Sequence, residues 1–194
     1  ATPTPLSGER LEELLQVFLR VCDAVAFAHS RGVIHRDLKP SNIMVGTHGQ
    51  VYVMDWGVAL LREGPRPAES MRVPHVRSGA DTLPEALGSL TGTPSFMAPE
   101  QARGEVTRID ERTDVYGLGG ILYFLLTARA PHEAESVEAS LQLAKAGRVV
   151  APERAAPETP LPPFLCRIAR RALAAAQEDR YPDVAELKRD VEAF

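Results

Sequence analysis

The chain has 194 residues, a length that fits one domain rather than two. Its 44% hydrophobic and 25% charged residues are typical of a globular protein, which excludes collagen, a long coiled coil and a largely disordered chain. The net charge of -4, from 22 Lys and Arg against 26 Asp and Glu, argues against binding of nucleic acid or an acidic membrane through bulk positive charge.

The cysteines and the longest apolar run indicate a reducing compartment and no membrane contact by this chain. Cys22 and Cys166 lie in apolar stretches of helical pattern, which predicts reduced core thiols rather than a disulfide. The run Val115–Leu126 is too short and too interrupted by glycine to span a bilayer, and no signal sequence opens the chain. We therefore expect a cytoplasmic chain and leave open a membrane tether outside it.

The first predicted element is one long helix over Leu11–Arg31. Its apolar residues recur at i, i+3, i+4 and i+7, which is the period of an amphipathic helix. Ser7 stands at a suitable N-cap position, and Gly32 stands where a left-handed residue commonly ends a helix. Residues 33–34 then predict a short extended segment.

Two short β-rich runs, Asn42–Val45 and Val51–Met54, predict a hairpin, because a glycine-bearing loop at 46–50 separates them. Residues 57–99 show no sustained period, and 62–88 are rich in Pro, Gly, Ser and Arg, which predicts a long loop. The fold class is therefore mainly α with a small β-hairpin. The remaining predicted elements are helices at about Thr113–Thr127, Glu135–Ala146, Phe164–Ala176 and Asp183–Phe194, with Pro162, Pro163 and Pro182 at helix starts.

One cluster of polar residues contains the candidate catalytic and metal-binding side chains. The run HRDLKPSN occupies 35–42, and DWG at 55–57 follows the predicted hairpin. Because the hairpin brings its two ends together, we expect Asp37, Asn42 and Asp55 to lie at one edge of it. Carboxylate and amide oxygens with a lysine nearby suit Mg²⁺ and a transferred phosphate.

Two further motifs follow: GTPSFMAPE at 92–100 and DVYGLG at 114–119. In this order the four motifs resemble the carboxy-terminal half of a protein kinase catalytic domain, most closely the eukaryotic-like Ser/Thr kinases of bacteria. The resemblance covers the chain from about Leu11 to its end. It implies the large lobe of the α+β kinase fold, a single partial domain over 1–194 in which 57–99 form a long activation loop.

The resemblance also implies catalytic and nucleotide-binding roles. Asp37 would orient the substrate hydroxyl and accept its proton, while Lys39 would neutralise charge on the moving γ-phosphoryl. Thr93 would lie beside both, although a turn-capping role before the next proline is compatible with this. Lys39 and Thr93 together favour Ser or Thr acceptors. Mg²⁺ or Mn²⁺ would be held by Asn42 and Asp55, and ATP would be contacted by Lys39, Asn42, Met44 and Asp55.

Regulation by phosphorylation is implied as well. In the family, an arginine at the position of Arg36 pairs with a phosphate on the activation loop and orders it. Ser89 and Thr91 are the favoured phosphate acceptors, because they lie closest to the GTPSF end of the loop. The other candidates are Ser70, Ser78 and Thr82.

The same resemblance implies structural roles for five residues. Glu100 is expected to form a buried ion pair with Arg180, and Asp114 to hold the backbone of the catalytic loop. His35 and Trp56 are expected to pack behind the site, with Trp56 standing where the family usually has Phe. The five histidines show no metal-ligand spacing, so we expect no zinc site.

The predicted loop is longer than is usual for the family and carries four arginines, Arg62, Arg66, Arg72 and Arg77. A solvated insert is the simpler interpretation of these residues. A docking arm for an acidic partner is the alternative. Both interpretations leave Asp55 in place as a metal ligand.

The kinase motifs that hold the ATP phosphates from the small lobe do not occur in this sequence. It has no G-x-G-x-x-G, and its lysines are Lys39, Lys145 and Lys188. We expect the small lobe to lie upstream of Ala1, so that the isolated chain binds little nucleotide and has negligible turnover. Apolar surface left uncovered in this way would favour a homodimer.

We expect the parent protein to be an enzyme that acts on protein substrates. A pseudokinase or protein-interaction module is the alternative, but Asp37, Lys39, Asn42 and Asp55 are all present, and a pseudokinase typically lacks one of these. Small-molecule kinases share part of the fold but lack the segment seen at Ala98–Glu100.

Overall fold

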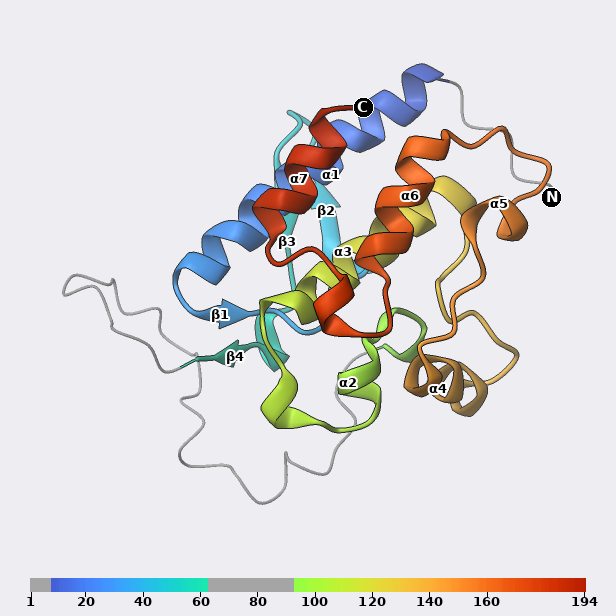
Figure 1. Ribbon diagram of the computed structural model, residues 1–194. Helices are drawn as coiled ribbons and strands as arrows, with labels where there is room; N and C mark the ends of the chain where they lie inside the picture. The colour runs from blue at the N-terminus through green and yellow to red at the C-terminus, as the bar shows by residue number, and fades with distance from the viewer. Residues whose placement is uncertain (1–7, 63–92) are drawn as a thin grey trace.

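The computed structural model describes residues 8–62 and 93–194 as a mainly helical structure with two small antiparallel strand pairs (Figure 1). The prediction of a mainly α fold with a small hairpin is therefore confirmed. The helices are α1 (Gly8–Ser30), α2 (Pro99–Ala102), α3 (Glu111–Thr127), α4 (Val137–Ala146), α5 (Pro152–Ala155), α6 (Pro163–Ala172) and α7 (Val184–Glu192). The strands are β1 (Val33–Ile34), β2 (Ile43–Val45), β3 (Val51–Val53) and β4 (Leu60–Leu61).

The long first helix confirms the expectation from the apolar spacing. One face of α1 is buried, with Phe18, Cys22 and Val25 in the main hydrophobic core. The helix ends where expected, because Gly32 takes a φ of +74° that a side chain would strain. Ser7, the expected N-cap, lies outside the described residues.

Helix α3 lies at the centre of the molecule, between the α1–α7 pair and α6 (Figure 1). Its residues are buried on nearly every side, which explains why its sequence over 115–126 is apolar rather than amphipathic. Two glycines allow neighbouring segments to approach closely. A Cβ on Gly117 would lie 2.8 Å from Cβ of Leu38, and one on Gly119 would lie 2.7 Å from Cβ of Ala172.

The predicted hairpin is formed by β2 and β3, with Met44 opposite Tyr52 in the register. Because side chains alternate across a strand, Ile43, Val51 and Val53 pack against the core. Met44 and Tyr52 point the other way and remain 46% and 48% exposed. One face of the hairpin thus belongs to the core, and the described residues leave the other face open.

The structure differs from the sequence-based expectation in several boundaries. Helix α6 ends at Ala172 instead of Ala176, and the carbonyls of Ala174 and Ala175 turn to accept hydrogen bonds from Arg180. Helix α4 begins after Ser136, whose Oγ accepts the Ala139 N–H as an N-cap. The short elements α2, α5 and β4 were not expected from the periodicity.

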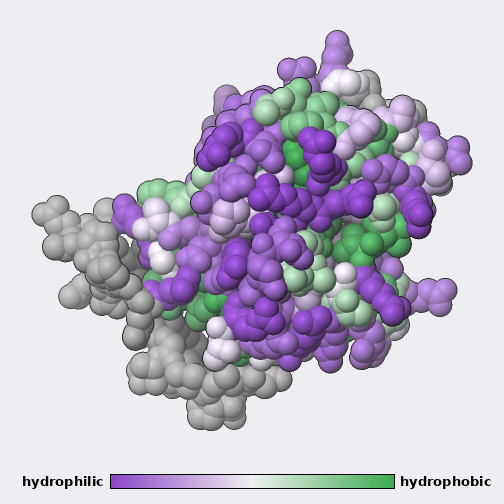
Figure 2. Space-filling view, in the orientation of Figure 1, coloured by the Kyte–Doolittle hydropathy of each residue, from purple (hydrophilic) through white to green (hydrophobic). Residues whose placement is uncertain are grey.

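Both cysteines are buried and free, which confirms the prediction of reduced core thiols. Of the predicted loop 57–99, residues 63–92 lie outside the described part of the chain. Within the described part, no helix combines the length and the apolar character needed to cross a bilayer. Hydrophilic residues cover most of the molecular face shown in Figure 2.

Candidate active site

The segment that follows β1 is held in place by one buried carboxylate. Asp114, in the first turn of α3, accepts hydrogen bonds from the backbone N–H groups of His35 and Arg36, each at 2.8 Å. His29 at the end of α1 places Nε2 2.7 Å from the same carboxylate. The end of α1 and the residues after β1, both far from Asp114 in the chain, therefore meet at this carboxylate.

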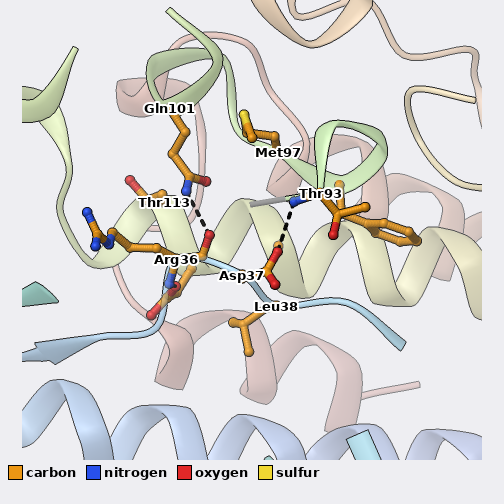
Figure 3. A pocket seen from close by; sticks show the side chains of 10 residues that line it. Arg36, Asp37, Leu38, Thr93, Met97, Gln101 and Thr113 are labelled. Atoms are coloured by element: carbon orange, nitrogen blue, oxygen red, sulfur yellow. Dashed lines mark hydrogen bonds between the residues drawn. The ribbon is translucent and has the colours of Figure 1, made fainter. Parts of the chain in front are cut away.

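Arg36 has a left-handed backbone, with a φ of +69°, which is costly for a residue with a side chain. Its N–H is fixed by Asp114, and its carbonyl accepts Nε2 of Gln101 at 2.7 Å (Figure 3). These two bonds hold the strained conformation and turn the following residue, Asp37, toward Thr93. Gln101 follows the expected GTPSFMAPE motif directly, yet its side chain gave no signal in the sequence.

Replacing Asp114 by Asn is expected to lower the free energy of unfolding by about 3 kcal/mol, because an amide cannot accept all three bonds and loses the charge. Urea unfolding of the variant measures this loss. Asp23→Asn is the matched control, since Asp23 is an exposed surface carboxylate paired with Lys188, and it should change stability by less than about 1 kcal/mol. Equal stabilities of the two variants would contradict the role of Asp114.

His35 is completely buried and hydrogen-bonded through both ring nitrogens. Nε2 lies 3.0 Å from the Met54 carbonyl, and Nδ1 accepts the Asp37 N–H at 3.2 Å. These partners require the tautomer with a proton on Nε2, so neither nitrogen is free to act as a base. The Trp56 ring packs against His35 with centroids 4.5 Å apart, but Trp56 remains 36% exposed, so the expected packing of Trp56 is only partial.

The side chains of Asp37, Lys39 and Thr93 form one hydrogen-bonded group. Asp37 accepts a hydrogen bond from Nζ of Lys39 on Oδ2 at 2.7 Å. Its Oδ1 accepts the backbone N–H of Thr93 at 3.0 Å, the bond dashed in Figure 3. Lys39 also donates to Oγ1 of Thr93. Asp37 and Lys39 are 54 and more residues from Thr93, and the fold brings the three together at a partly open position.

Asn42 joins this group from the 3₁₀ turn Pro40–Asn42 that precedes β2. Its Nδ2 donates to the carbonyl and to Oδ2 of Asp37, at 2.8 and 3.1 Å, so its amide oxygen faces away from Asp37. The carbonyl of Asn42 accepts the Met54 N–H at 2.8 Å, which brings the residue after Met54, Asp55, to this end of the hairpin. Asp55 is exposed and has a left-handed φ of +62°.

Asn42 and Asp55 together offer an amide oxygen and a carboxylate, which are donors that fit Mg²⁺ or Mn²⁺. Met44 lies two residues after Asn42 on the exposed face of the hairpin. Asn42 and Asp55 therefore lie at the same end of the hairpin, and Asn42 is hydrogen-bonded to Asp37.

Arg36 extends its side chain toward the start of the predicted loop, where Nε donates to the Val58 carbonyl. Burial lowers the pKa of the Arg36 guanidinium, and the charge of Asp114 opposes that shift. The guanidinium remains charged at neutral pH, because arginine starts from a very high pKa. Ser89 and Thr91, the favoured phosphate acceptors, lie outside the described residues, as do Ser70, Ser78 and Thr82.

A pocket lies between the segment that follows β1, the turn Pro94–Phe96 and α3 (Figure 3). Asp37 and Thr93 both line it, and the backbone N–H of Thr93 donates to the Asp37 carboxylate. Its lining residues are Arg36, Asp37, Leu38, Thr93, Phe96, Met97, Gln101, Thr113, Asp114 and Gly117.

Glu100 and Arg180 form a bidentate ion pair that is almost fully buried. Nη1 and Nη2 of Arg180 each lie 2.8 Å from a carboxylate oxygen of Glu100. Burial alone would raise the pKa of Glu100, but the hydrogen bonds and charge of Arg180 outweigh burial and hold that pKa below its ordinary value. Thr113 and Gln177 also donate to this carboxylate, and the sequence had not indicated either of them.

Arg62 is the one loop arginine within the described residues, and it pairs with Glu111 at the start of α3 at 2.7 Å. Arg66, Arg72 and Arg77 lie outside them. The Arg62 pair ties the end of β4 to α3, so at this position the side chain has a partner within the chain itself.

Comparison with known proteins identifies relatives of this chain. The profile described as "Protein kinase domain" matches residues 8–181. The chain is 40% identical over 181 residues to a serine/threonine-protein kinase PknD of Chlamydia caviae, with 92% of this chain and 19% of that protein aligned. The PknD of Protochlamydia amoebophila is 36% identical over 188 residues, with 96% and 19% aligned, and that of Chlamydia trachomatis is 33% identical over 192 residues, with 95% and 20% aligned.

The chain spans about a fifth of the length of these relatives, so the match concerns one region of each. Within that region the match covers nearly all of this chain. The profile match runs through the Asp37 group, the pocket and Arg180. The chain therefore belongs to the protein kinase domain family.

Proposed function

We propose that this chain is part of a protein kinase that transfers the γ-phosphoryl group of ATP to Ser or Thr hydroxyls of proteins. The observation that carries the proposal is the group formed by Asp37, Lys39 and Thr93. The Lys39 ammonium donates to both the Asp37 carboxylate and the Thr93 hydroxyl, and the backbone N–H of Thr93 donates to the same carboxylate. The PknD relatives are named as serine/threonine-protein kinases, which supports this acceptor class.

In this proposal Asp37 is the residue that orients the acceptor hydroxyl and accepts its proton. The Lys39 ammonium lies next to that carboxylate and would neutralise charge that grows on the transferred phosphoryl oxygens. Thr93 fixes both partners, because its backbone N–H binds Asp37 and its hydroxyl accepts from Lys39. A divalent cation, Mg²⁺ or Mn²⁺, would be held by the oxygens of Asn42 and Asp55 and would screen the ATP phosphates.

We further propose that the chain corresponds to the large lobe, with 57–99 as its activation loop, and that its nucleotide site is completed by a small lobe. The exposed apolar face of the hairpin supports this, since Met44 and Tyr52 pair there and no described residue covers them. The sequence also lacks a glycine-rich phosphate loop. The isolated chain is then expected to bind ATP weakly, and a second copy could occupy the open face.

Arg36 is proposed to bind a phosphate on the activation loop, with Ser89 and Thr91 as the residues that carry it. Its guanidinium lies beside Val58, near the point where the predicted loop begins. Structural roles are proposed for His35, Trp56, Glu100, Asp114 and Arg180. Cys22 and Cys166 are buried and form no disulfide, which supports a cytoplasmic site of action, where ATP and protein substrates are also found.

The proposal is tested by intact mass spectrometry of the chain and of a longer form extended upstream, each incubated with Mg²⁺, ATP and a generic Ser/Thr substrate. The longer form is expected to add phosphate to the substrate, while the isolated chain adds none. A gain by the isolated chain that disappears in Asp37→Asn would contradict the need for a small lobe. Silence of both forms would contradict the kinase activity and favour an interaction module.

Lys39→Met is expected to lower kcat of the active form by about 100-fold, because a preorganised charge near the transferred group is worth about 2.7–4 kcal/mol. Lys188→Met is the matched control, since Lys188 pairs with Asp23 on the surface and should leave kcat unchanged. Steady-state kinetics with saturating ATP measure both. If Lys39→Met kept the kcat of the control, Lys39 would have no part in the transfer.

A further inference from the structure

His132 is a buried titratable residue that none of the proposed catalytic steps uses. It follows α3, is completely buried, and its ring is stacked on that of Tyr116 with centroids 5.9 Å apart. Its Nε2 lies 2.7 Å from the Tyr116 hydroxyl, and its Nδ1 lies 3.2 Å from the Arg148 carbonyl. Both ring nitrogens therefore have partners that lie on different elements.

The two partners determine the protonation state of the ring. A carbonyl oxygen only accepts, so Nδ1 must carry a proton and donate it to Arg148. Nε2 then accepts the hydroxyl proton of Tyr116. Burial lowers the pKa of His132, although hydrogen bonds to the Arg148 and Met97 backbones oppose that shift. A second proton would meet the positive charge of Arg180, whose guanidinium carbon lies 4.8 Å from the centroid of the Tyr116 ring.

The backbone of His132 connects this ring to the candidate active site. Its N–H donates to the carbonyl of Ser95 at 3.1 Å. Ser95 is the middle residue of the turn Pro94–Phe96, which directly follows Thr93. Thr93 in turn holds Asp37 and Lys39. His132 is thus connected through the turn Pro94–Phe96 to Thr93, which binds the proposed catalytic carboxylate of Asp37.

The other side of the turn is also in contact with α3. The rings of Phe96 and Phe124 lie 6.3 Å apart, and a Cβ on Gly120 would come within 3.0 Å of Phe96. The turn therefore packs on α3 through Phe96, while the Ser95 carbonyl is held by the backbone N–H of His132. The hydrogen bond from His132 fixes the orientation of the turn, because hydrogen bonds depend on angle and apolar packing does not.

We propose that His132, as the neutral imidazole protonated on Nδ1, is a positioning residue that fixes the segment Thr93–Phe96 for binding of the acceptor protein. This inference rests on the proposed kinase function. It assigns His132 to the acceptor side of the site, because the turn that His132 binds follows Thr93, and Thr93 contacts Asp37 and Lys39, the residues proposed to act on the acceptor hydroxyl and the transferred group. Loss of the two ring hydrogen bonds should therefore affect use of the acceptor and leave binding of ATP intact.

The kinetic test uses the full-length protein that carries this chain, with a Ser-containing peptide as acceptor. His132→Phe keeps a planar ring but loses both ring hydrogen bonds, whereas His132→Gln retains one donor and one acceptor. His132→Phe is expected to lower kcat/KM for the peptide about tenfold, with KM for ATP changed less than twofold, and His132→Gln should recover most of the loss. Equal losses in both variants, or an equal effect on KM for ATP, would overturn the positioning role.

A second readout does not depend on activity. In long-range ¹H–¹⁵N spectra of the full-length protein, the ring signals that vanish in His132→Phe are expected to show a proton on Nδ1 and a bare Nε2. The amide of Phe96, which donates to the Thr93 carbonyl at 2.9 Å, should exchange with solvent at least tenfold faster in His132→Phe. Its exchange in Tyr116→Phe should rise by a smaller factor, because the Arg148 bond remains.

The two readouts separate the inference from the function on which it rests. If the unmodified protein transfers no phosphate, the kinase proposal fails, and the tautomer and the exchange of Phe96 still decide whether His132 fixes the turn. A proton on Nε2, or unchanged exchange of Phe96, would overturn the inference even in an active enzyme.

Discussion

Asp37→Asn is expected to lower kcat for phosphoryl transfer by about 10²–10⁴-fold, the range typical for loss of a general base. The amide has nearly the shape of the carboxylate but cannot take the acceptor proton. It also places an NH₂ group among Lys39, Asn42 and the Thr93 N–H, which all donate to Asp37 in the structure. Steady-state kinetics of the full-length protein with Mg²⁺ and ATP measure the change.

Two comparisons make this result specific to Asp37. Asp23→Asn removes an exposed carboxylate and should leave kcat unchanged. KM for ATP should also remain within about threefold in Asp37→Asn, because the metal donors assigned to nucleotide binding are Asn42 and Asp55. Retention of full kcat in Asp37→Asn would remove Asp37 from the catalytic role.

Arg180→Met is expected to lower the free energy of unfolding by about 3 to 5 kcal/mol, because it leaves the Glu100 carboxylate buried without its partner. Arg180 also donates to the carbonyls of Arg112, Ala174 and Ala175, so its loss leaves those acceptors unpaired as well. Urea unfolding of the two proteins, followed by circular dichroism, gives the difference.

A double-mutant cycle with Glu100→Gln isolates the pair itself. The Glu100→Gln/Arg180→Met protein should be destabilised by less than the sum of the two single changes. The exposed pair Arg171 and Glu186, at 3.0 Å, serves as the matched control, and its coupling should stay below about 1 kcal/mol. Equal coupling energies in the two cycles would contradict the claim that burial strengthens the interaction between Glu100 and Arg180.

The same pair predicts a dependence on pH. The pKa of Glu100 is held below its ordinary value of 4.5 in the folded protein, so its contribution to stability is complete above about pH 4.5. That contribution is lost as the pH falls through the depressed pKa of the folded state. The difference in stability between the unmodified protein and Arg180→Met should therefore shrink below pH 4.5. A difference that stays constant from pH 7 to pH 3 would contradict this.

The sequence predicted best what depends on neighbours along the chain. The helix over 11–31 and the hairpin of β2 and β3 follow from apolar spacing and from glycine-bearing turns, and both were found. The Asp37 and Asn42 contact also spans only five residues. In each case the pattern and the structure involve the same short segment.

The sequence predicted poorly what depends on distant segments. The pairing of β1 with β4 joins Val33 to Leu61 in strands of two residues, which is too short for a period to appear. His29, Gln101 and His132 act through partners that are remote in the chain, so their positions had no local signal. The arrangement of these residues follows from packing around α3.

The central claim is that the Asp37, Lys39 and Thr93 group belongs to a Ser/Thr protein kinase. The most direct test is transfer of the γ-phosphoryl from labelled ATP by the full-length protein, followed by phosphoamino-acid analysis of the acceptor protein. We predict label on serine or threonine that requires a divalent cation and disappears in Asp37→Asn. Label on tyrosine, or no label above the Asp37→Asn background, would contradict the claim.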